Sequence, residues 1–176
     1  MIRFLLLRRL RAFGRRFDYD VTYMEEILSE DLAGFLKFYG VTLLSSHGFG
    51  LPKGPLHAAK FVATRAAGCG PCVQLVVALA AVDGVVPEDL ARAGREGAQA
   101  DPDMRLAAHF AQAVVDQAPD LPLLAQEVQA RWGRRGLIGL AAAIATAQFY
   151  PMMKRAMGHA QSCDILPEAL RATPVE

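Results

Sequence analysis

The sequence predicts an all-α fold, a single-domain bundle of seven to eight helices, and three observations carry that prediction. Apolar residues make up 53% of the 176-residue chain and recur mostly at helical spacing. Helix-start patterns such as Asp101-Pro102-Asp103 separate the apolar segments. Alternating strand patterns and hairpin dipeptides are nearly absent. A chain of this length can bury a core of its own as one domain.

The first part of the chain is expected to contain two helices before a glycine-rich loop. Residues 2–16 combine leucine, isoleucine and phenylalanine with arginine, which predicts an amphipathic helix. Residues 20–39 predict a second helix, with Gly40 as its stop. Val41–Ser46 is expected as a short extended piece, followed by a loop over His47–Gly54.

Glycine and proline delimit the later helices. A helix is expected over residues 55–67, and Gly68 separates it from the next helix, over Cys69–Val82. Further helix starts are predicted at three residues, Pro87, Asp101 and Asp120. The last long helix is expected over residues 136–157, bent by Pro151.

Residues 1–17 form an arginine-rich N-terminal segment, and residues 18–176 are expected to form the helical domain. The segment holds six arginines and no acidic residue: Arg3, Arg8, Arg9, Arg11, Arg15 and Arg16. Such a helix suits an anionic membrane surface, but it also suits a neighbouring subunit that leaves the arginines in water. We favour the subunit contact over membrane-surface contact through residues 2–16. We therefore expect a homo-oligomer built partly through residues 2–16 or 137–150.

Charge and cysteine count exclude several classes of protein. The net charge is +1, so no global basic field attracts nucleic acid. The apolar run Leu137–Ala147 is too short to span a bilayer, and no secretory cleavage pattern follows the apolar residues near the N-terminus. Three cysteines do not make a secreted disulfide framework. We expect a cytoplasmic protein with reduced thiols, no cofactor and no nucleic-acid partner.

The motif Gly68-Cys69-Gly70-Pro71-Cys72 is the strongest chemical signal in the chain. Two cysteines three residues apart at the start of a helix can close a disulfide with little backbone movement. The free N–H groups and the positive end of the helix dipole favour a thiolate there. No acidic residue lies between Leu32 and Val82, whereas that segment contains several basic ones: Lys37, Lys53, Lys60, Arg65, His47 and His57. The pattern predicts thiol–disulfide redox chemistry at Cys69 and Cys72.

The sequence Cys-Gly-Pro-Cys also occurs at the active site of thioredoxin, but its context here is different. A thioredoxin needs a strand leading into the motif and a βαβ unit around it. In this chain a predicted helix over residues 55–67 leads in, and helices follow. We therefore reject a thioredoxin fold while keeping the redox interpretation.

Short motifs before and after the cysteine pair indicate a resemblance to a known family, which extends from about Asp18 to Cys163. In order they are Tyr19-Asp20-Val21, Tyr23, Ala66-Ala67-Gly68-Cys69-Gly70-Pro71-Cys72, Gln74-Leu75, Phe110-Ala111, Trp132-Gly133, Tyr150-Pro151, Lys154, Gly158-His159 and Cys163. In these pieces the chain resembles the alkylhydroperoxidase D-like proteins of the carboxymuconolactone decarboxylase superfamily. The resemblance implies an all-helical homo-oligomer. It also implies a cysteine pair that reduces a peroxide, one cysteine attacking and the other resolving, with a thiol reductant to restore it.

The chain departs from the family at the proton relay. Positions where the family often has histidine hold Val76 and Pro71, and the position of a family glutamate holds His57. Peroxide cleavage needs a base for the thiol and an acid for the leaving alkoxide, so we expect slow or no peroxidase activity. The decarboxylases of the superfamily do not rely on a cysteine pair, so that activity is less supported still.

The candidate catalytic residues are therefore Cys69, Cys72 and His57, with His57 as the replacement base if its helix packs antiparallel to the next. The expected substrate is a small peroxide or a disulfide. The alternative is a non-catalytic, ligand-binding or redox-sensing member of the same fold. Helix-end electrostatics favour Cys69 as the attacking thiol, whereas the family's peroxidases use the second position, Cys72; both assignments stay open.

A tetrahedral zinc site is the third alternative. His159 and Cys163 are four residues apart and would complete a tetrahedral set with Cys69 and Cys72. Nothing in the sequence brings the two pairs together, and their separation is much longer than in compact zinc modules. We therefore predict no metal, and expect Cys163 to be a third thiol or a core residue.

Overall fold

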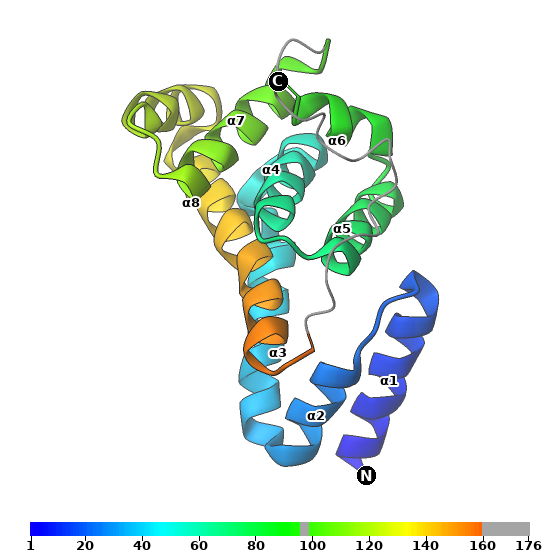
Figure 1. Cartoon of the computed structure of the whole chain (residues 1–176). Coiled ribbons are helices and arrows are strands. Elements are labelled where there is room, and N and C mark those ends of the chain that lie inside the picture. Colours follow the sequence, from blue (N-terminus) through cyan, green and yellow to red (C-terminus); the bar gives the residue numbers. More distant parts are fainter. Residues whose placement is uncertain (96–98, 160–176) are drawn as a thin grey trace.

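A computed structural model describes residues 1–95 and 99–159. This part of the chain contains eight α-helices, one short 3₁₀ turn and no strand, which confirms the predicted all-α class (Figure 1). The elements are α1 (Ile2–Phe17), α2 (Thr22–Glu30), α3 (Leu32–His47), η1 (Gly48–Gly50), α4 (Lys53–Ala66), α5 (Gly70–Val82), α6 (Pro87–Ala93), α7 (Pro102–Asp116) and α8 (Leu121–Ala156).

Helix α4 is the centre of the fold. Nine of its fourteen residues are buried, and it packs against α5, α7 and α8. Ala58, Ala59 and Ala63 are fully buried, and their small side chains let the neighbouring helices approach closely. In Figure 1, α4 to α7 gather in the upper half of the view. The second half of α8 runs down beside α3 towards α1 and α2.

The buried side chains form two cores. The upper core surrounds α4 and includes Phe61, Leu90 and Leu140. The lower core lies where α1 and α2 meet α3, and its centre is Tyr23 and Phe35. Cys72 belongs to the lower core although the helix that carries it, α5, borders the upper one. The CxxC motif therefore lies between the two cores.

The expectation of one helix over residues 20–39 is wrong, because the chain breaks at Asp31. Asp31 has an extended backbone (φ −140°, ψ 108°), and its side chain accepts a hydrogen bond from the backbone N–H of Ala33. An aspartate in this conformation is a strong helix N-cap. It ends α2 and starts α3 in a single residue.

The expectations of a stop at Gly40 and an extended piece over Val41–Ser46 are also wrong. Helix α3 continues to His47 and ends at Gly48, whose φ of +66° suits glycine. An interior glycine costs a helix only about 1 kcal/mol relative to alanine. The packing of α3 along α8 outweighs that cost, because tertiary contacts supply most of the stability of helices in proteins. The predicted loop over His47–Gly54 is shorter than expected, since α4 begins at Lys53.

Helix α8 consists of two segments that meet at Gly133, close to the expected boundary between a helix that starts at Asp120 and one over residues 136–157. Gly133 has φ 69° and ψ 179°, a conformation that only glycine adopts readily. By length and composition α8 could cross a membrane, and so could the bent pair α5–α6 if taken as one span. No membrane-spanning helix is expected from the sequence. The apolar core helix of a folded protein can have the same length and composition as a membrane span, so these two properties do not distinguish them. Here α8 packs against α3, α4 and α7.

Candidate thiol site

The cysteine pair lies at the start of α5, as predicted. Gly68, with φ +68°, turns the chain after α4, and Cys69 is the N-cap of α5 with an extended backbone. Pro71 lies in the first turn, where a missing N–H costs nothing. Cys69 and Cys72 are joined by a disulfide, with their Cα atoms 5.3 Å apart. The predicted geometry, a helix start with the cysteines in disulfide reach, is confirmed.

The two sulfurs face different surroundings. Cys72 is only 4% exposed and belongs to the lower core, whereas Cys69 is partly exposed. The hydroxyl oxygen of Tyr19 lies 3.7 Å from the sulfur of Cys72. A disulfide sulfur carries no hydrogen, so here the Tyr19 O–H donates. Burial raises the pKa of Tyr19 to about 12, so the phenol keeps its proton at neutral pH.

The position of Tyr19 is set by the connection between α1 and α2. Asp18 ends α1 in the left-handed conformation (φ 48°), and the backbone N–H of Tyr19 donates to the carbonyl of Gly14. A Cβ atom at Gly14 would lie 2.8 Å from the Tyr19 carbonyl oxygen. Only glycine therefore allows this close approach.

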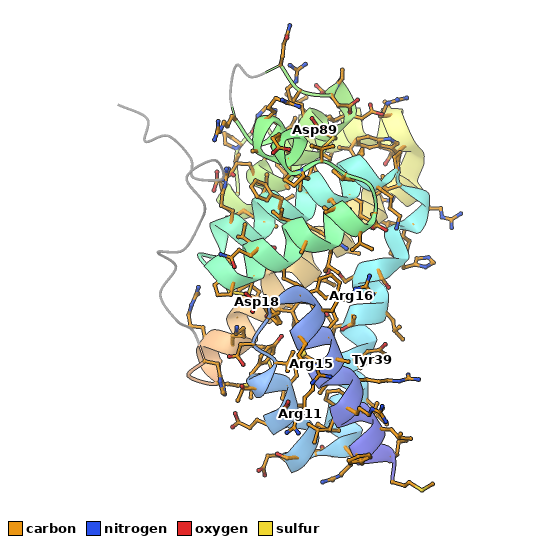
Figure 2. The ribbon with its side chains drawn as sticks, turned by 90° about the vertical axis from the view of Figure 1, so that its right-hand side faces the viewer. Arg11, Arg15, Arg16, Asp18, Tyr39 and Asp89 are labelled. Atoms are coloured by element: carbon orange, nitrogen blue, oxygen red, sulfur yellow. A yellow bond between two sulfur atoms is a disulfide. The ribbon has the colours of Figure 1, made fainter. Side chains whose placement is uncertain are left out.

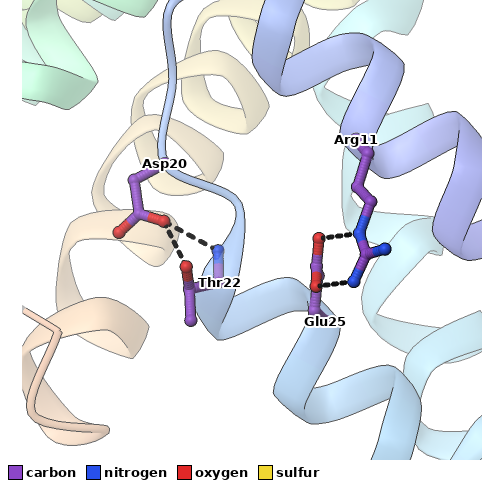
Figure 3. A network of polar contacts seen from close by, with 4 residues as sticks. All are labelled: Arg11, Asp20, Thr22 and Glu25. Atoms are coloured by element: carbon purple, nitrogen blue, oxygen red, sulfur yellow. Dashed lines mark hydrogen bonds and ion pairs between the residues drawn. The ribbon is translucent and has the colours of Figure 1, made fainter.

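Two polar contacts hold the same connection from the side of α2 (Figure 3). The Asp20 carboxylate accepts hydrogen bonds from the N–H and hydroxyl of Thr22, which lower the pKa of Asp20. Arg11 of α1 donates two hydrogen bonds to the carboxylate of Glu25 in α2, at 2.9 and 3.0 Å. Together they fix the short segment that presents Tyr19 to Cys72.

A buried lysine lies over the tyrosine pair. The ammonium nitrogen of Lys154 is 4.8 Å from the ring centre of Tyr19 and 5.5 Å from that of Tyr23. Burial lowers the pKa of Lys154 below its usual value. A cation over an aromatic face is attracted to it, which stabilises the orientation of Tyr19.

A cavity of about 240 Å³ lies beside Cys72. Its walls come from α1 to α5, the connections between them and the second half of α8, and they are mostly apolar. Cys72 contributes to the wall and Cys69 does not. Thr42 and Ser46 of the wall are exposed, which gives the cavity a solvent-facing side. A small molecule in this cavity would meet Cys72.

His57 lines the same cavity but lies at the other end of α5 from the cysteines. Its Nε2 atom is 2.7 Å from the carboxylate of Asp83, which also pairs with Lys53 at 3.1 Å. Asp83 is eleven residues beyond Cys72, which corresponds to about 16 Å along a helix. Proton exchange between His57 and Cys72 would therefore need water or substrate in between. The catalytic role of His57 stays a prediction.

The electrostatics of this pair define the protonation of His57. The hydrogen bond from His57 and the charge of Lys53 lower the pKa of Asp83, so its carboxylate is ionised. Burial lowers the pKa of His57, although Asp83 opposes the effect. A neutral ring that donates through Nε2 leaves Nδ1 as a bare acceptor. That Nδ1 atom is buried without a hydrogen-bond partner.

Two residues of the site escaped sequence reasoning. Tyr19 entered only as a piece of the family resemblance, and Asp83 lies just beyond the helix expected over Cys69–Val82. Their contacts join residues 53 and 26 positions apart, which local patterns do not reveal. An acidic residue directly after the helix expected over Cys69–Val82 was the available signal for Asp83.

Val76 lines the cavity beside Cys72, so this part of its wall is apolar. His159 contacts an acidic side chain instead: its Nε2 atom is 2.7 Å from the carboxylate of Glu26. Within residues 1–95 and 99–159 no group of three or more histidine, cysteine or acidic side chains could hold a metal ion. Cys163 lies outside the described residues.

Comparison with family models, with curated proteins and with solved structures gave no match. The resemblance to the alkylhydroperoxidase D-like proteins therefore rests on the residues of this chain alone, and no comparison shows a family for it.

Proposed function

We propose that this protein is a thiol–disulfide redox protein whose reactive group is the Cys69–Cys72 pair. The observation that carries the proposal is the disulfide itself, formed at a helix N-terminus with Cys72 in the wall of a cavity. A helix N-terminus stabilises a thiolate, which is the species that attacks. We also propose that the chain is an alkylhydroperoxidase D-like member of the carboxymuconolactone decarboxylase superfamily, supported by its all-helical fold and CxxC position.

The proposed reaction transfers two electrons to a disulfide substrate. A thiolate of the reduced pair attacks one sulfur of the substrate, whose S–S bond breaks, and the leaving thiolate takes a proton from solvent. The second cysteine then attacks the mixed disulfide, forms the Cys69–Cys72 bond and releases the other substrate thiol. A thiol reductant restores the pair by the reverse exchange.

The surroundings of the sulfurs suggest how the two cysteines divide this work. Cys69 is partly exposed, so a disulfide or thiol on another protein reaches it from solvent. Cys72 is reached through the cavity, where the Tyr19 hydroxyl donates a hydrogen bond to its sulfur. The same hydrogen bond stabilises a thiolate on Cys72 once the pair is reduced.

Peroxide reduction follows as a slow side activity in this proposal. The Cys72 thiolate attacks the peroxide, the O–O bond breaks, and the alkoxide needs a proton as it leaves. The sulfenic acid then condenses with Cys69, forming the disulfide and releasing water. Val76 and Pro71 replace the family's histidines, and losing general acid–base help typically costs about 10²–10⁴-fold in rate.

A redox titration tests the proposal. The protein is equilibrated in dithiothreitol buffers of graded potential, and its free thiols are counted by alkylation and mass spectrometry. We expect one two-electron transition that Cys69→Ser and Cys72→Ser abolish and that Cys163→Ser leaves unchanged. Stopped-flow mixing of the reduced protein with cumene hydroperoxide should show slow oxidation. A pair that stays reduced at every potential, or cysteine variants that react like the wild type, would refute the redox function.

A further inference from the structure

Two buried side-chain atoms in the described part of the chain lack a hydrogen-bond partner, and both belong to residues of one cavity. They are Nδ1 of His57 and the Thr64 hydroxyl. Buried polar atoms in folded proteins nearly always have a partner. Their concentration around a single cavity of about 240 Å³ points to an occupant with polar groups of its own.

The charge of the wall indicates the sign of that occupant. None of the residues that line the cavity is acidic, and Lys60 is the one lysine or arginine among them. Its ammonium donates one hydrogen bond, 2.7 Å long, to the carbonyl of Ser45 near the end of α3. An ammonium has three N–H donors, so the hydrogen bond to Ser45 leaves two donors of Lys60 for another acceptor. Thr64 lies one helical turn beyond Lys60 on the same face of α4.

The remaining wall indicates an apolar body. Leu75, Val76 and Leu79 line the cavity from α5, and Phe13 and Ala147 also contribute to its wall. A cavity of about 150 Å³ lined by apolar side chains accommodates benzene. The present cavity is larger, so it has room for a ring or short chain together with a charged group.

We propose that this cavity binds a small organic acid, with its carboxylate at Lys60 and Thr64 and its apolar body along α5 towards Cys72. His57 lies one turn before Lys60 and closes the polar end of the cavity. Nδ1 of His57 accepts a hydrogen bond from a hydroxyl on the ligand or takes up a proton beside the carboxylate. As a statement about the substrate of the cysteine pair, the inference rests on the proposed function. Binding itself needs no reaction at the cysteines.

Calorimetric titration of the oxidised protein tests this inference. The probes are phenylacetate and octanoate, and their amides are controls of matched size without the charge. We expect the acids to bind at least about ten-fold more tightly than the amides, because a charge-assisted hydrogen bond is lost with each amide. Lys60→Gln keeps a donor for the Ser45 carbonyl and removes the charge, so it should erase this preference. Lys37→Met removes an exposed charge on α3 and should leave it unchanged.

A second variant locates the binding. Val76→Phe fills the cavity and should abolish binding of acids and amides alike, whereas Cys72→Ser should retain the preference for acids. Equal affinity for acid and amide, unaltered binding in Lys60→Gln, or no saturable binding of either acid would each overturn the inference, leaving water as the occupant. Failure of the redox proposal would show differently, as the absence of a dithiol–disulfide transition in a protein that still binds acids.

Discussion

Tyr19 is the residue whose contact with Cys72 most directly concerns reactivity. Tyr19→Phe removes the hydroxyl that donates to the sulfur and leaves the ring in place beneath Lys154. We expect alkylation of reduced protein by iodoacetamide to slow by about three- to ten-fold at neutral pH, because the thiolate loses a hydrogen bond worth about 0.5–1.5 kcal/mol. The pH profile of alkylation should move to higher pH. Tyr39→Phe, at a tyrosine 47% exposed on α3, is the matched control, and an identical slowing there would contradict the assignment.

Lys60 should leave a signature in the pH dependence of stability. Burial lowers its pKa from 10.5 to about 8 in the folded protein. Between these values the unfolded chain binds more protons, so the free energy of unfolding rises with pH across this window. Lys60 therefore costs stability below about pH 8, and the cost disappears above about pH 10.5.

The comparison with Lys60→Met makes that signature measurable. We compare the free energies of unfolding of the variant and the wild type at two pH values. The variant minus wild-type difference should be larger at about pH 7 than at about pH 10, by on the order of 1–2 kcal/mol after allowance for solvent screening. Urea unfolding at the two pH values measures the difference. A constant difference between variant and wild type would show that the Lys60 pKa is not lowered.

At the scale of elements, two glycines in helices predict opposite outcomes. Gly14→Ala places a Cβ atom 2.8 Å from the Tyr19 carbonyl and 3.3 Å from the Val21 side chain. The connection between α1 and α2 must then shift, so we expect Gly14→Ala to lose about 1–3 kcal/mol of stability. Because Tyr19 moves with this connection, alkylation of the reduced variant should also slow, as in Tyr19→Phe.

Gly40→Ala is the control for that variant. A Cβ atom at Gly40 meets nothing within 4 Å, and the residue lies inside α3. Alanine there should raise the free energy of unfolding by about 0.5–1 kcal/mol. Thermal or urea unfolding of both variants checks the pair, and a Gly14→Ala protein as stable as Gly40→Ala would contradict the close approach.

The same elements mark the limit of sequence reasoning. Asp101 before Pro102 was predicted to start a helix, and its side chain caps α7 at the N–H of Met104. Such signals act within a few residues and are legible in sequence. The predicted helix stop at Gly40 is wrong because α3 packs against α8, which lies more than a hundred residues later in the chain. This packing keeps the helix intact despite the cost of an interior glycine. Likewise the cysteine pair was predictable, but its partner Tyr19 was not.

For the whole molecule, exposed apolar side chains predict self-association. Leu36, Tyr39, Leu43 and Leu44 on α3 are 45–58% exposed, and Ile138 on the neighbouring α8 is 46% exposed. Figure 2 labels Tyr39 of this set on α3, together with Arg15 and Arg16 on α1. Exposed apolar surface of this kind commonly marks an interface.

Sedimentation velocity tests this prediction. We expect a homo-oligomer for the wild type and a smaller species for Ile138→Glu, because a buried, unpaired charge opposes association. Leu123→Glu, at a residue 62% exposed at the other end of α8, should leave the oligomer intact. A wild type that remains monomeric up to the solubility limit would contradict the prediction.

The unequal exposure of the two sulfurs has a consequence for which molecules can reach each cysteine. In the proposed reaction, large partners would reach only Cys69 at the surface, and small ones would meet Cys72 through a cavity of about 240 Å³. The fold would then act as a sieve that sorts reaction partners by size. A protein reductant and a small substrate would not compete for the same entrance, so electrons would be supplied and delivered by separate routes.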